Sequence, residues 1–532
     1  MSFLSTRVRI RATAAALGAI FALAAPPANL YPAMWLGMAG LAWLLEDAGG
    51  HDARARGRLR TAFTGAARGL AFGFGANMIA LRFVPAVIAR FTPLPWAAGL
   101  LALALLSLFE GMRWAIAAMA CEGAARLRAP RWASIAIGVY AGTFVPTIFP
   151  WSAAGGVTPW PAMVQLADVV GERGVTLLMA LSAGLLASGV RAVVERASRR
   201  TAVTMLVSAI AIPLATLVYG AVRIRQIDAM RASAPTVKIG LVQPSIQATE
   251  RWDEARAPAI LSKLTELTKS SERKGAELTI WPEAAYPYPL PHATRRAPIG
   301  RFEVLPYGVR GPVLTGLVLV EGPGVSFNSA TVVTADGALA PPQDKVHLLW
   351  FGETVPFADR WPWLKRTFAR GVGLTPGDTF VPLRVGAVRA AVLNCFEDTL
   401  PDAGREAMRA SPNLLVNVTN DAWFSGSVES ELHLRLAALR AVELRRDLVR
   451  AVNFGPTSWV DASGRVRMRY ASDIAGTLLA QPALLEWPPT IYARFGDAPL
   501  VALLFALCVA LLARGRRARS DDEHKRTKGA RS

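Results

Sequence analysis

Long apolar runs dominate the first 222 residues of this 532-residue chain, and one more follows near its C-terminus. Each run approaches the ~20 residues that a helix needs to cross a hydrocarbon core of ~30 Å. The pattern predicts a polytopic membrane domain with eight transmembrane helices. They are expected at about residues 12–26, 30–46, 62–81, 97–120, 132–150, 174–190, 203–222 and 498–513.

Basic residues gather at every second loop between these runs. The clusters are Arg7, Arg9 and Arg11; Arg54, Arg56, Arg58 and Arg60; Arg126, Arg128 and Arg131; Arg191, Arg196, Arg199 and Arg200; and the tail 514–532. Nucleic-acid binding does not explain this alternation, although the formal net charge is +20. The positive-inside rule does explain it, and it predicts cytoplasmic termini with residues 223–497 on the opposite side.

Residues 1–26 have an alternative interpretation as a cleaved signal peptide, because "FALAAPPA" places small residues after an apolar stretch. A second apolar run starts almost at once, and an uncleaved first span keeps the alternation of basic loops intact. The pattern therefore favours a membrane anchor.

The apolar pattern changes from Val237 onward to short β-branched runs that end at Pro, Gly, Asn or Asp, which is typical of strands. Helical patterns lie between them at Ala255–Arg273 and Glu431–Arg446. In the second, Leu432, Leu436, Leu439 and Val442 predict one apolar face. Strands alternating with helices indicate an α/β domain. The predicted strands are "VKIGLVQPS", "AELTIWPE", "PVLTGLVLV", "FNSATVVTADG", "VGAVRAAVLNC", "NLLVNVTND" and "RAVNFGPTSWVDASG".

Four segments follow from these patterns. The expected segments are helices one to seven at 1–222, an extracytoplasmic α/β domain at 223–497, an eighth helix at 498–513 and a basic cytoplasmic tail at 514–532. At roughly 270 residues, the α/β domain is large enough to bury a core of its own.

Reactive side chains follow three of the predicted strands: Glu283 in "TIWPEAA", Lys345 in "DKVHLLWFGE" and Cys395 in "LNCFED". A thiol with an ordinary pKa of about 8.5 is mostly protonated at pH 7, so a catalytic Cys needs a base or a cationic neighbour. A Glu can take the proton, and a Lys can stabilise an oxyanion. Taken singly, each has a plain alternative: a buried apolar thiol, a solvated acid and a surface cation.

The three cysteines, Cys121, Cys395 and Cys508, cannot form a disulfide framework. The sequence has no CxxC and no His pair at helical spacing, and it contains only five histidines. We therefore predict no metal site.

The motifs "IWPE", "DK..L..FGE", "NCFED" and "VNVTNDAWF" resemble, in order and approximate spacing, those of the nitrilase (carbon-nitrogen hydrolase) superfamily. With the predicted spans, and with "IFPW" and "GLLA" around spans five and six, nearly the whole chain is similar to the apolipoprotein N-acyltransferase family. The resemblance implies a nitrilase-like αββα sandwich in the bacterial inner membrane, with its catalytic domain on the periplasmic side.

By this resemblance, Glu283 is the general base, Lys345 the oxyanion stabiliser and Cys395 the nucleophile. Glu353 is expected to orient Lys345, and Glu397 to support the site. The implied substrate-binding residues are Trp252, Asn328, Phe396 and Trp423, the two tryptophans on mobile loops that admit lipid.

The resemblance also implies the substrates. Cys395 would take an acyl chain from a phospholipid, typically phosphatidylethanolamine, as a thioester. The free α-amine of a diacylglyceryl-modified N-terminal cysteine on an apolipoprotein would then accept it. This chemistry needs no ATP, metal or organic cofactor.

The sequence departs from the family pattern near the site. Phe396 and Trp350 stand where Tyr and Pro are usual, "WFSGS" carries an extra residue, and "VNFGPT" replaces an Asn-Asn-Gly pattern. Two alternatives therefore stay open: a membrane-tethered relative that acylates another amine or hydrolyses an amide, and a non-catalytic structural or interaction protein.

Overall fold

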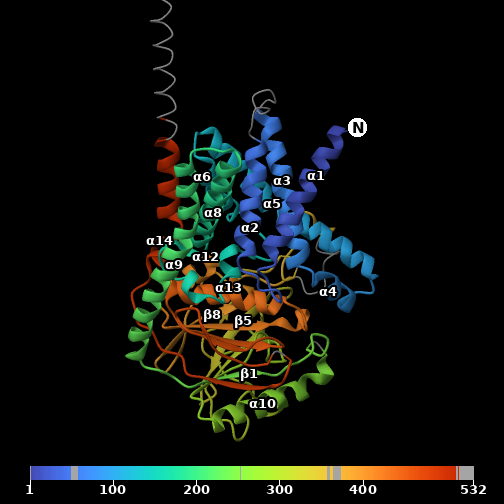
Figure 1. The fold of residues 1–532 in the computed structure, drawn as a ribbon. Coiled ribbons are helices and arrows are strands. Elements are labelled where there is room, and N and C mark those ends of the chain that lie inside the picture. The colour runs from blue at the N-terminus through green and yellow to red at the C-terminus, as the bar shows by residue number, and fades with distance from the viewer. Residues whose placement is uncertain are drawn as a thin grey trace, which may run out of the picture. The chain divides into compact units, whose positions relative to one another are not determined.

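The computed structural model describes residues 2–48, 58–251, 253–350, 352–355, 360–363, 373–471, 473–510 and 513. Trp252, predicted to bind lipid, and the predicted basic tail lie outside these residues. The chain divides into two compact units (Figure 1). One comprises Met1–Val157, Ala162–Gly220 and Phe495–Ser532, and the other comprises Thr158–Pro161 and Ala221–Arg494.

The first unit is helical, and a helix overlaps each span predicted from the sequence. Its helices are α1 (Ser2–Ala22), α2 (Ala33–Ala48), α3 (Arg58–Ala80), α4 (Val84–Phe91), α5 (Trp96–Arg126), α6 (Arg131–Gly142), α7 (Ala153–Gly156), α8 (Ala167–Val194), α9 (Arg199–Ala232), which continues into the second unit, and Ala498–Ala510.

Among the described residues, three helices are long and apolar enough to cross a membrane: α5, α8 and α9. A fourth candidate is the pair Ala62–Ala80 and Val84–Arg90, which is bent by 54°. The prediction of a helical membrane region is confirmed at this coarser level. Helix length explains part of the difference between these three or four candidates and the eight predicted spans, because α6 has 12 residues and reaches only about 18 Å. Charge explains another part, because α1 carries three arginines.

Helix α5 holds the "IFPW" segment of the same unit through two polar side chains, the buried Glu110 and the half-buried Arg113. Glu110 Oε1 accepts hydrogen bonds from Ile148 N (2.6 Å) and Phe149 N (3.2 Å). Arg113 Nη1 donates to Trp151 O over 2.6 Å. These contacts satisfy backbone groups that no regular element pairs, which is the usual condition for burying them.

The second unit contains two sheets in the described part of the chain. One has the order β13-β1-β2-β4-β5-β6, with β3 also paired to β4, and the other has the order β12-β11-β10-β9-β8-β7. The strands are β1 (Ile239–Gln243), β2 (Leu278–Ile280), β3 (Leu290–Pro291), β4 (Val313–Val320), β5 (Ser326–Val333), β6 (Gln343–Asp344), β7 (Leu383–Val385), β8 (Val388–Asn394), β9 (Leu414–Asn420), β10 (Leu448–Asn453), β11 (Ser458–Val460), β12 (Val466–Arg469) and β13 (Gly476–Ala480).

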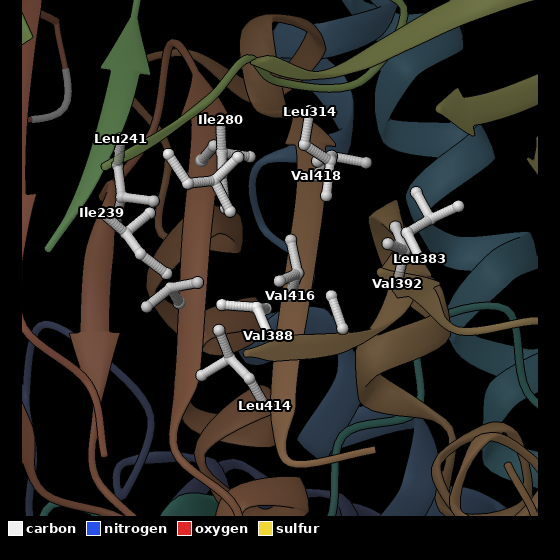
Figure 2. Packing of buried hydrophobic residues seen from close by; sticks show 14 of the residues in the cluster. Ile239, Leu241, Ile280, Leu314, Leu383, Val388, Val392, Leu414, Val416 and Val418 are labelled. Carbon is white, nitrogen blue, oxygen red and sulfur yellow. The ribbon is translucent and has the colours of Figure 1, made fainter. Parts of the chain in front are cut away.

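The two sheets pack face to face through one apolar cluster (Figure 2). Alternate residues of β9 enter it, namely Leu414, Val416 and Val418, whereas Leu415 between them belongs to a cluster on the opposite face. This alternation is the period of two expected of a strand buried on both sides. It also explains why these strands read in the sequence as nearly continuous apolar runs.

Helices cover the two outer faces. Helix α10 (Ala257–Arg273) packs on the first sheet, and α12 (Pro401–Met408) and α13 (Glu429–Leu444) pack on the second (Figure 1). The layers are therefore α, β, β and α, and the strands and both helices predicted for this segment are confirmed. Almost all of α13 is buried, and its face in the cluster with the second sheet differs from the predicted one. That face is Leu434, Ala437, Ala438, Ala441 and Leu444.

Parallel pairing sets where the reactive residues emerge. Strand β2 lies parallel to β1 and β4, and β9 lies parallel to β8 and β10. Glu283 follows the carboxyl end of β2, and Cys395 follows that of β8 directly. Loops at the carboxyl ends of parallel strands are free to hold functional groups while the sheet fixes their positions.

Candidate active site

Glu283 lies in a tight turn after β2. The next residue, Ala284, has a left-handed backbone with φ of 45°. The turn lies so close to β4 that a Cβ built on Gly316 would be 2.5 Å from Pro282 O and 2.8 Å from Glu283 Cα. Only glycine permits this approach without a shift of the neighbouring backbone. The position of the Glu283 carboxylate therefore depends on glycine at position 316 of the adjacent strand β4.

Lys345 follows β6 directly, is 1% exposed and points at two carboxylates. Its Nζ lies 2.8 Å from Glu353 Oε1 and 3.3 Å from Glu283 Oε1. Asn328 Nδ2, from β5, donates to the same two atoms at 3.1 Å and 2.7 Å. Glu283 Oε2 accepts a hydrogen bond from Asn420 N over 3.1 Å. The ammonium and both acids are thus fixed by strands of both sheets.

Cys395 begins the 3-10 turn η5 (Cys395–Thr399) with φ of 51°. A left-handed backbone is uncommon for a side chain other than glycine, asparagine or aspartate, and here neighbouring groups hold it. Asn417 Nδ2, from β9, donates to Leu393 O (2.8 Å) and to Cys395 O (2.9 Å). The Asn417 side chain accepts from Arg450 Nε over 3.2 Å. The turn that carries Cys395 is therefore anchored by β9 and, behind it, by β10.

Glu397 joins the segment after Lys345 to the segment before Cys395. Its Oε1 accepts hydrogen bonds from Val346 N (2.8 Å) and His347 N (2.9 Å), and its Oε2 accepts from Asn394 N (2.7 Å). Burial raises the pKa of Glu397 to about 7. The pKa rises even though these bonds favour the ionised form, because burial without solvent costs more than they return.

Charges in the site are strongly coupled. Burial, and then the charge of Glu283, holds the pKa of the Cys395 thiol well above its ordinary value. Burial also raises the pKa of Glu283, although Lys345 acts in the opposite direction. Burial favours the neutral amine of Lys345, but Glu353 and Glu283 outweigh it, and its pKa is raised. These shifts keep the Cys395 thiol and the Lys345 amine protonated at neutral pH and make Glu283 a stronger base than an exposed carboxylate.

Phe396 covers the ammonium from the nucleophile turn, with its ring centroid 5.3 Å from Lys345 Nζ. That distance is within the range of a cation–π interaction, which is worth most in desolvated surroundings. Phe396 lacks the hydroxyl of the tyrosine that is usual at this position in the family, but it keeps the contact between the ring and the ammonium.

This arrangement provides the groups that acyl transfer requires. A protonated thiol needs a base to become a nucleophile, and Glu283 is a buried carboxylate coupled to it. An oxyanion needs a cation that is already in place, and Lys345 is oriented by two acids that Asn328 in turn holds.

Two protein families match this chain, one over the helical region and one over the α/β domain. Residues 17–185 match the family described as the apolipoprotein N-acyltransferase N-terminal domain, and residues 238–487 match the carbon-nitrogen hydrolase family. An apolipoprotein N-acyltransferase from Bradyrhizobium diazoefficiens is 33% identical over 526 residues, which cover 94% of both chains. The chain belongs to the apolipoprotein N-acyltransferase family. A relative of the same name from Geobacter metallireducens is 29% identical over 501 residues, covering 90% of both chains.

Among solved structures, the chain is similar to an amidase from Nesterenkonia sp., at 18% identity and a TM-score of 0.36, covering 50% of this chain and 96% of that one. The family predicted from the motifs is confirmed, and with it an enzyme of the N-acyltransferase class that acts in lipoprotein maturation.

The structure of this N-acyltransferase brings most of the predicted site residues together. Hydrogen bonds, ion pairs, a cation–π contact and charge–charge interactions connect seven of them: Glu283, Asn328, Lys345, Glu353, Cys395, Phe396 and Glu397. Trp423 lies in the 3-10 turn η6 (Asp421–Phe424) after β9 and is 42% exposed.

Three polar residues that support the turn after Cys395 were not predicted from the sequence: Asn417, Arg450 and His433. A signal was present, because Asn417 and Arg450 interrupt apolar runs in strands that are buried on both faces. A buried charge needs a partner, so each predicts a polar contact without naming the element that supplies it.

Proposed function

We propose that Glu283, Lys345 and Cys395 carry out a two-step acyl transfer from a membrane phospholipid to the N-terminal amine of a diacylglyceryl-cysteine apolipoprotein. The observation that carries this proposal is the placement of Lys345 Nζ between the carboxylates of Glu283 and Glu353. Membership of the N-acyltransferase family supports the acceptor, and the phospholipid donor is our inference.

In the first step, Glu283 takes the thiol proton and the Cys395 sulfur attacks the carbonyl carbon of the sn-1 ester. Lys345 stabilises the oxyanion. The C–O bond breaks, the alkoxide of the lysophospholipid takes the proton from Glu283, and a thioester remains on Cys395. Exclusion of water would protect that thioester from hydrolysis.

In the second step, the acceptor amine attacks the thioester carbonyl. Glu283 accepts the proton that the nitrogen loses, the C–S bond breaks, and the thiolate of Cys395 recovers the proton from Glu283. An amide forms, and the free energy comes from the ester and the thioester. Glu353 would orient Lys345, Glu397 would hold the nucleophile turn, and the substrate contacts would include Trp252, Asn328, Phe396 and Trp423.

The same proposal includes the membrane arrangement. We infer eight spans, seven of them within 1–222 and one at 498–513, with the termini and the tail 514–532 in the cytoplasm. The catalytic domain at 223–497 would then lie on the periplasmic side of a bacterial inner membrane. Supporting observations are the helices that overlap each predicted span and the basic clusters at alternate loops.

A mass measurement tests the chemistry. Full-length enzyme is incubated with phosphatidylethanolamine, and its intact mass is recorded. We expect a gain equal to one acyl chain that hydroxylamine removes and that Cys395→Ala abolishes. Cys508→Ala, which removes another free thiol, serves as the matched control and should keep the gain.

A diacylglyceryl peptide is then added to the acylated enzyme. Transfer of the acyl chain to the peptide amine supports the proposed acceptor. Release to water instead would favour a hydrolase. A folded wild-type enzyme that gains no acyl mass would contradict the phospholipid donor.

A further inference from the structure

A buried imidazole lies behind the nucleophile turn. His433, on α13, is 4% exposed, and it contacts a carboxylate at each ring nitrogen. Its Nε2 lies 2.7 Å from Asp398 Oδ1, and its Nδ1 lies 3.4 Å from Asp421 Oδ1. Asp398 belongs to η5, three residues after Cys395, and Asp421 begins η6. One side chain thus spans two turns that are far apart in sequence.

The charges around His433 balance when the imidazole is protonated. Burial favours its neutral form, but the charge of Asp398 and the hydrogen bonds to Asp398 and Asp421 together outweigh burial and raise the pKa of His433 to about 10. Arg450, from β10, supplies a second cation, with Nε 3.3 Å from Asp398 Oδ2. Burial raises the pKa of Glu429 to about 8, so this acid is mostly neutral at pH 7. Two cations therefore face the two carboxylates Asp398 and Asp421.

The same groups have the spacing of a metal site, because ligand atoms of Asp421, Glu429 and His433 lie within 4.8 Å of one another. A metal-binding imidazole must be neutral and must offer one nitrogen. Both nitrogens of His433 already face carboxylates, and Arg450 pairs with one of these acids. We therefore interpret the cluster as an ion-pair network.

This network reaches the reacting groups from two directions. Through Asp398 it holds the turn that begins with Cys395. Through Asp421 it holds the turn that follows Asn420, whose N–H group binds Glu283. The charge of Asp421 also contributes, after burial and Glu283, to the raised pKa of the Cys395 thiol. A cation next to Asp421 therefore makes the thiolate easier to form.

We propose that His433 is a positioning residue for the acyl transfer: its imidazolium fastens the nucleophile turn η5 to η6 and neutralises the acids behind Cys395. This inference rests on the proposed role of Cys395 as the nucleophile. A substitution that keeps the size but removes the charge should leave the protein folded, loosen both turns and expose the thiolate to the charge of Asp421.

The first test is the rate at which Cys395 is acylated in a single turnover by phosphatidylethanolamine, measured on the full-length enzyme by intact mass. We expect His433→Gln to slow the acylation step by about 10- to 100-fold, the range expected when a reacting group is displaced by about 1 Å.

The second test needs no lipid. The rate of alkylation of Cys395 by iodoacetamide is followed against pH, with Cys121 and Cys508 replaced by Ala. We expect the pH midpoint of alkylation to be higher in His433→Gln than in the wild type. Loss of stability alone does not produce this shift, so the readout separates positioning from a structural role.

His292→Gln is the matched control. That histidine also pairs with an aspartate, Asp344, at 2.9 Å, but through one nitrogen and at a partly exposed site. It should keep both the acylation rate and the midpoint within about twofold of the wild type, since exposed pairs contribute little. If His433→Gln does not fold, Asp398→Asn breaks the same bridge and should slow acylation by a similar factor. Because it removes an anion, its midpoint should not rise.

The outcomes distinguish the two proposals. An unchanged acylation rate and an unchanged midpoint in folded His433→Gln, or an unchanged acylation rate in folded Asp398→Asn, would overturn the positioning role and leave the proposed function standing. A wild-type enzyme that is alkylated at Cys395 but never acylated would overturn the proposed function, and the alkylation midpoints would still decide the effect of His433.

Discussion

The carboxylate of Glu397 accepts hydrogen bonds from three backbone N–H groups, two beside Lys345 and one beside Cys395. A single side chain thereby sets the distance between the segments that carry the cation and the nucleophile. Both oxygens are acceptors in this arrangement, so the amide of Gln, whose nitrogen cannot accept, does not reproduce it.

We expect Glu397→Gln to destabilise the protein by about 1–3 kcal/mol, because its amide NH2 must face at least one backbone N–H group, and a buried donor loses its partner. Thermal unfolding of the purified protein measures the change. Glu266→Gln, which removes an exposed partner of Lys269, should lie within about 0.5 kcal/mol of the wild type. Equal effects of the two substitutions would contradict the bridging role.

The destabilisation should also depend on pH. The pKa of Glu397 is about 7 in the folded protein, above its ordinary value of 4.5, so folding binds a proton between these values. Its contribution to stability is full below about pH 4.5 and is lost as pH rises through about 7. The difference in melting temperature between wild type and Glu397→Gln should therefore shrink from pH 5 to pH 8. A growing difference would mean that the carboxylate is stabilised in its charged form.

Turns at strand ends, more than the strands themselves, decide the geometry of the site. The strands were predictable, since buried strands alternate between two apolar faces and end at Pro, Gly, Asn or Asp. The packing of Gly316 under the Glu283 turn was not predictable, because a glycine in a strand does not indicate which backbone approaches it. The network around His433 was not predictable either, because its members come from η5, η6, α13 and β10.

Gly316→Ala should reduce the rate of Cys395 acylation by about tenfold or more, because a new Cβ would push the Glu283 turn away from β4. Single-turnover acylation measures this effect. Gly123→Ala is the matched control, since a Cβ there meets no atom within 4 Å and lies in a helix, where Ala is favourable. Normal acylation by folded Gly316→Ala would show that the turn relaxes without cost.

At the scale of the whole molecule, the apolar runs located the helices but not the number of spans. Residues 132–150 predicted one span, whereas α6 ends at Gly142 and the "IFPW" segment leaves the helix to be held by Glu110 and Arg113. An apolar run shows that a segment is buried or faces lipid. It does not show how many of its residues are helical.

Labelling of introduced cysteines tests the proposed topology. Tyr307→Cys, at a fully exposed position of the second unit, should react with a membrane-impermeant maleimide in spheroplasts with an intact inner membrane. Arg199→Cys, in the fourth basic cluster, should react only after the membrane is permeabilised. The reverse pattern would place the catalytic domain in the cytoplasm and overturn the orientation derived from charge.

The left-handed backbone of Cys395 bears on the choice of an inactive enzyme for trapping substrates. With φ of 51°, this position disfavours β-branched side chains most strongly, so Thr or Val would move the turn as well as remove the thiol. Ala and Ser add no branch at Cβ, and Gly relieves the strain altogether. A complex captured with Cys395→Ser or Cys395→Ala would therefore report how the proposed acyl donor binds to the native turn, whereas one captured with Cys395→Val would report a displaced turn.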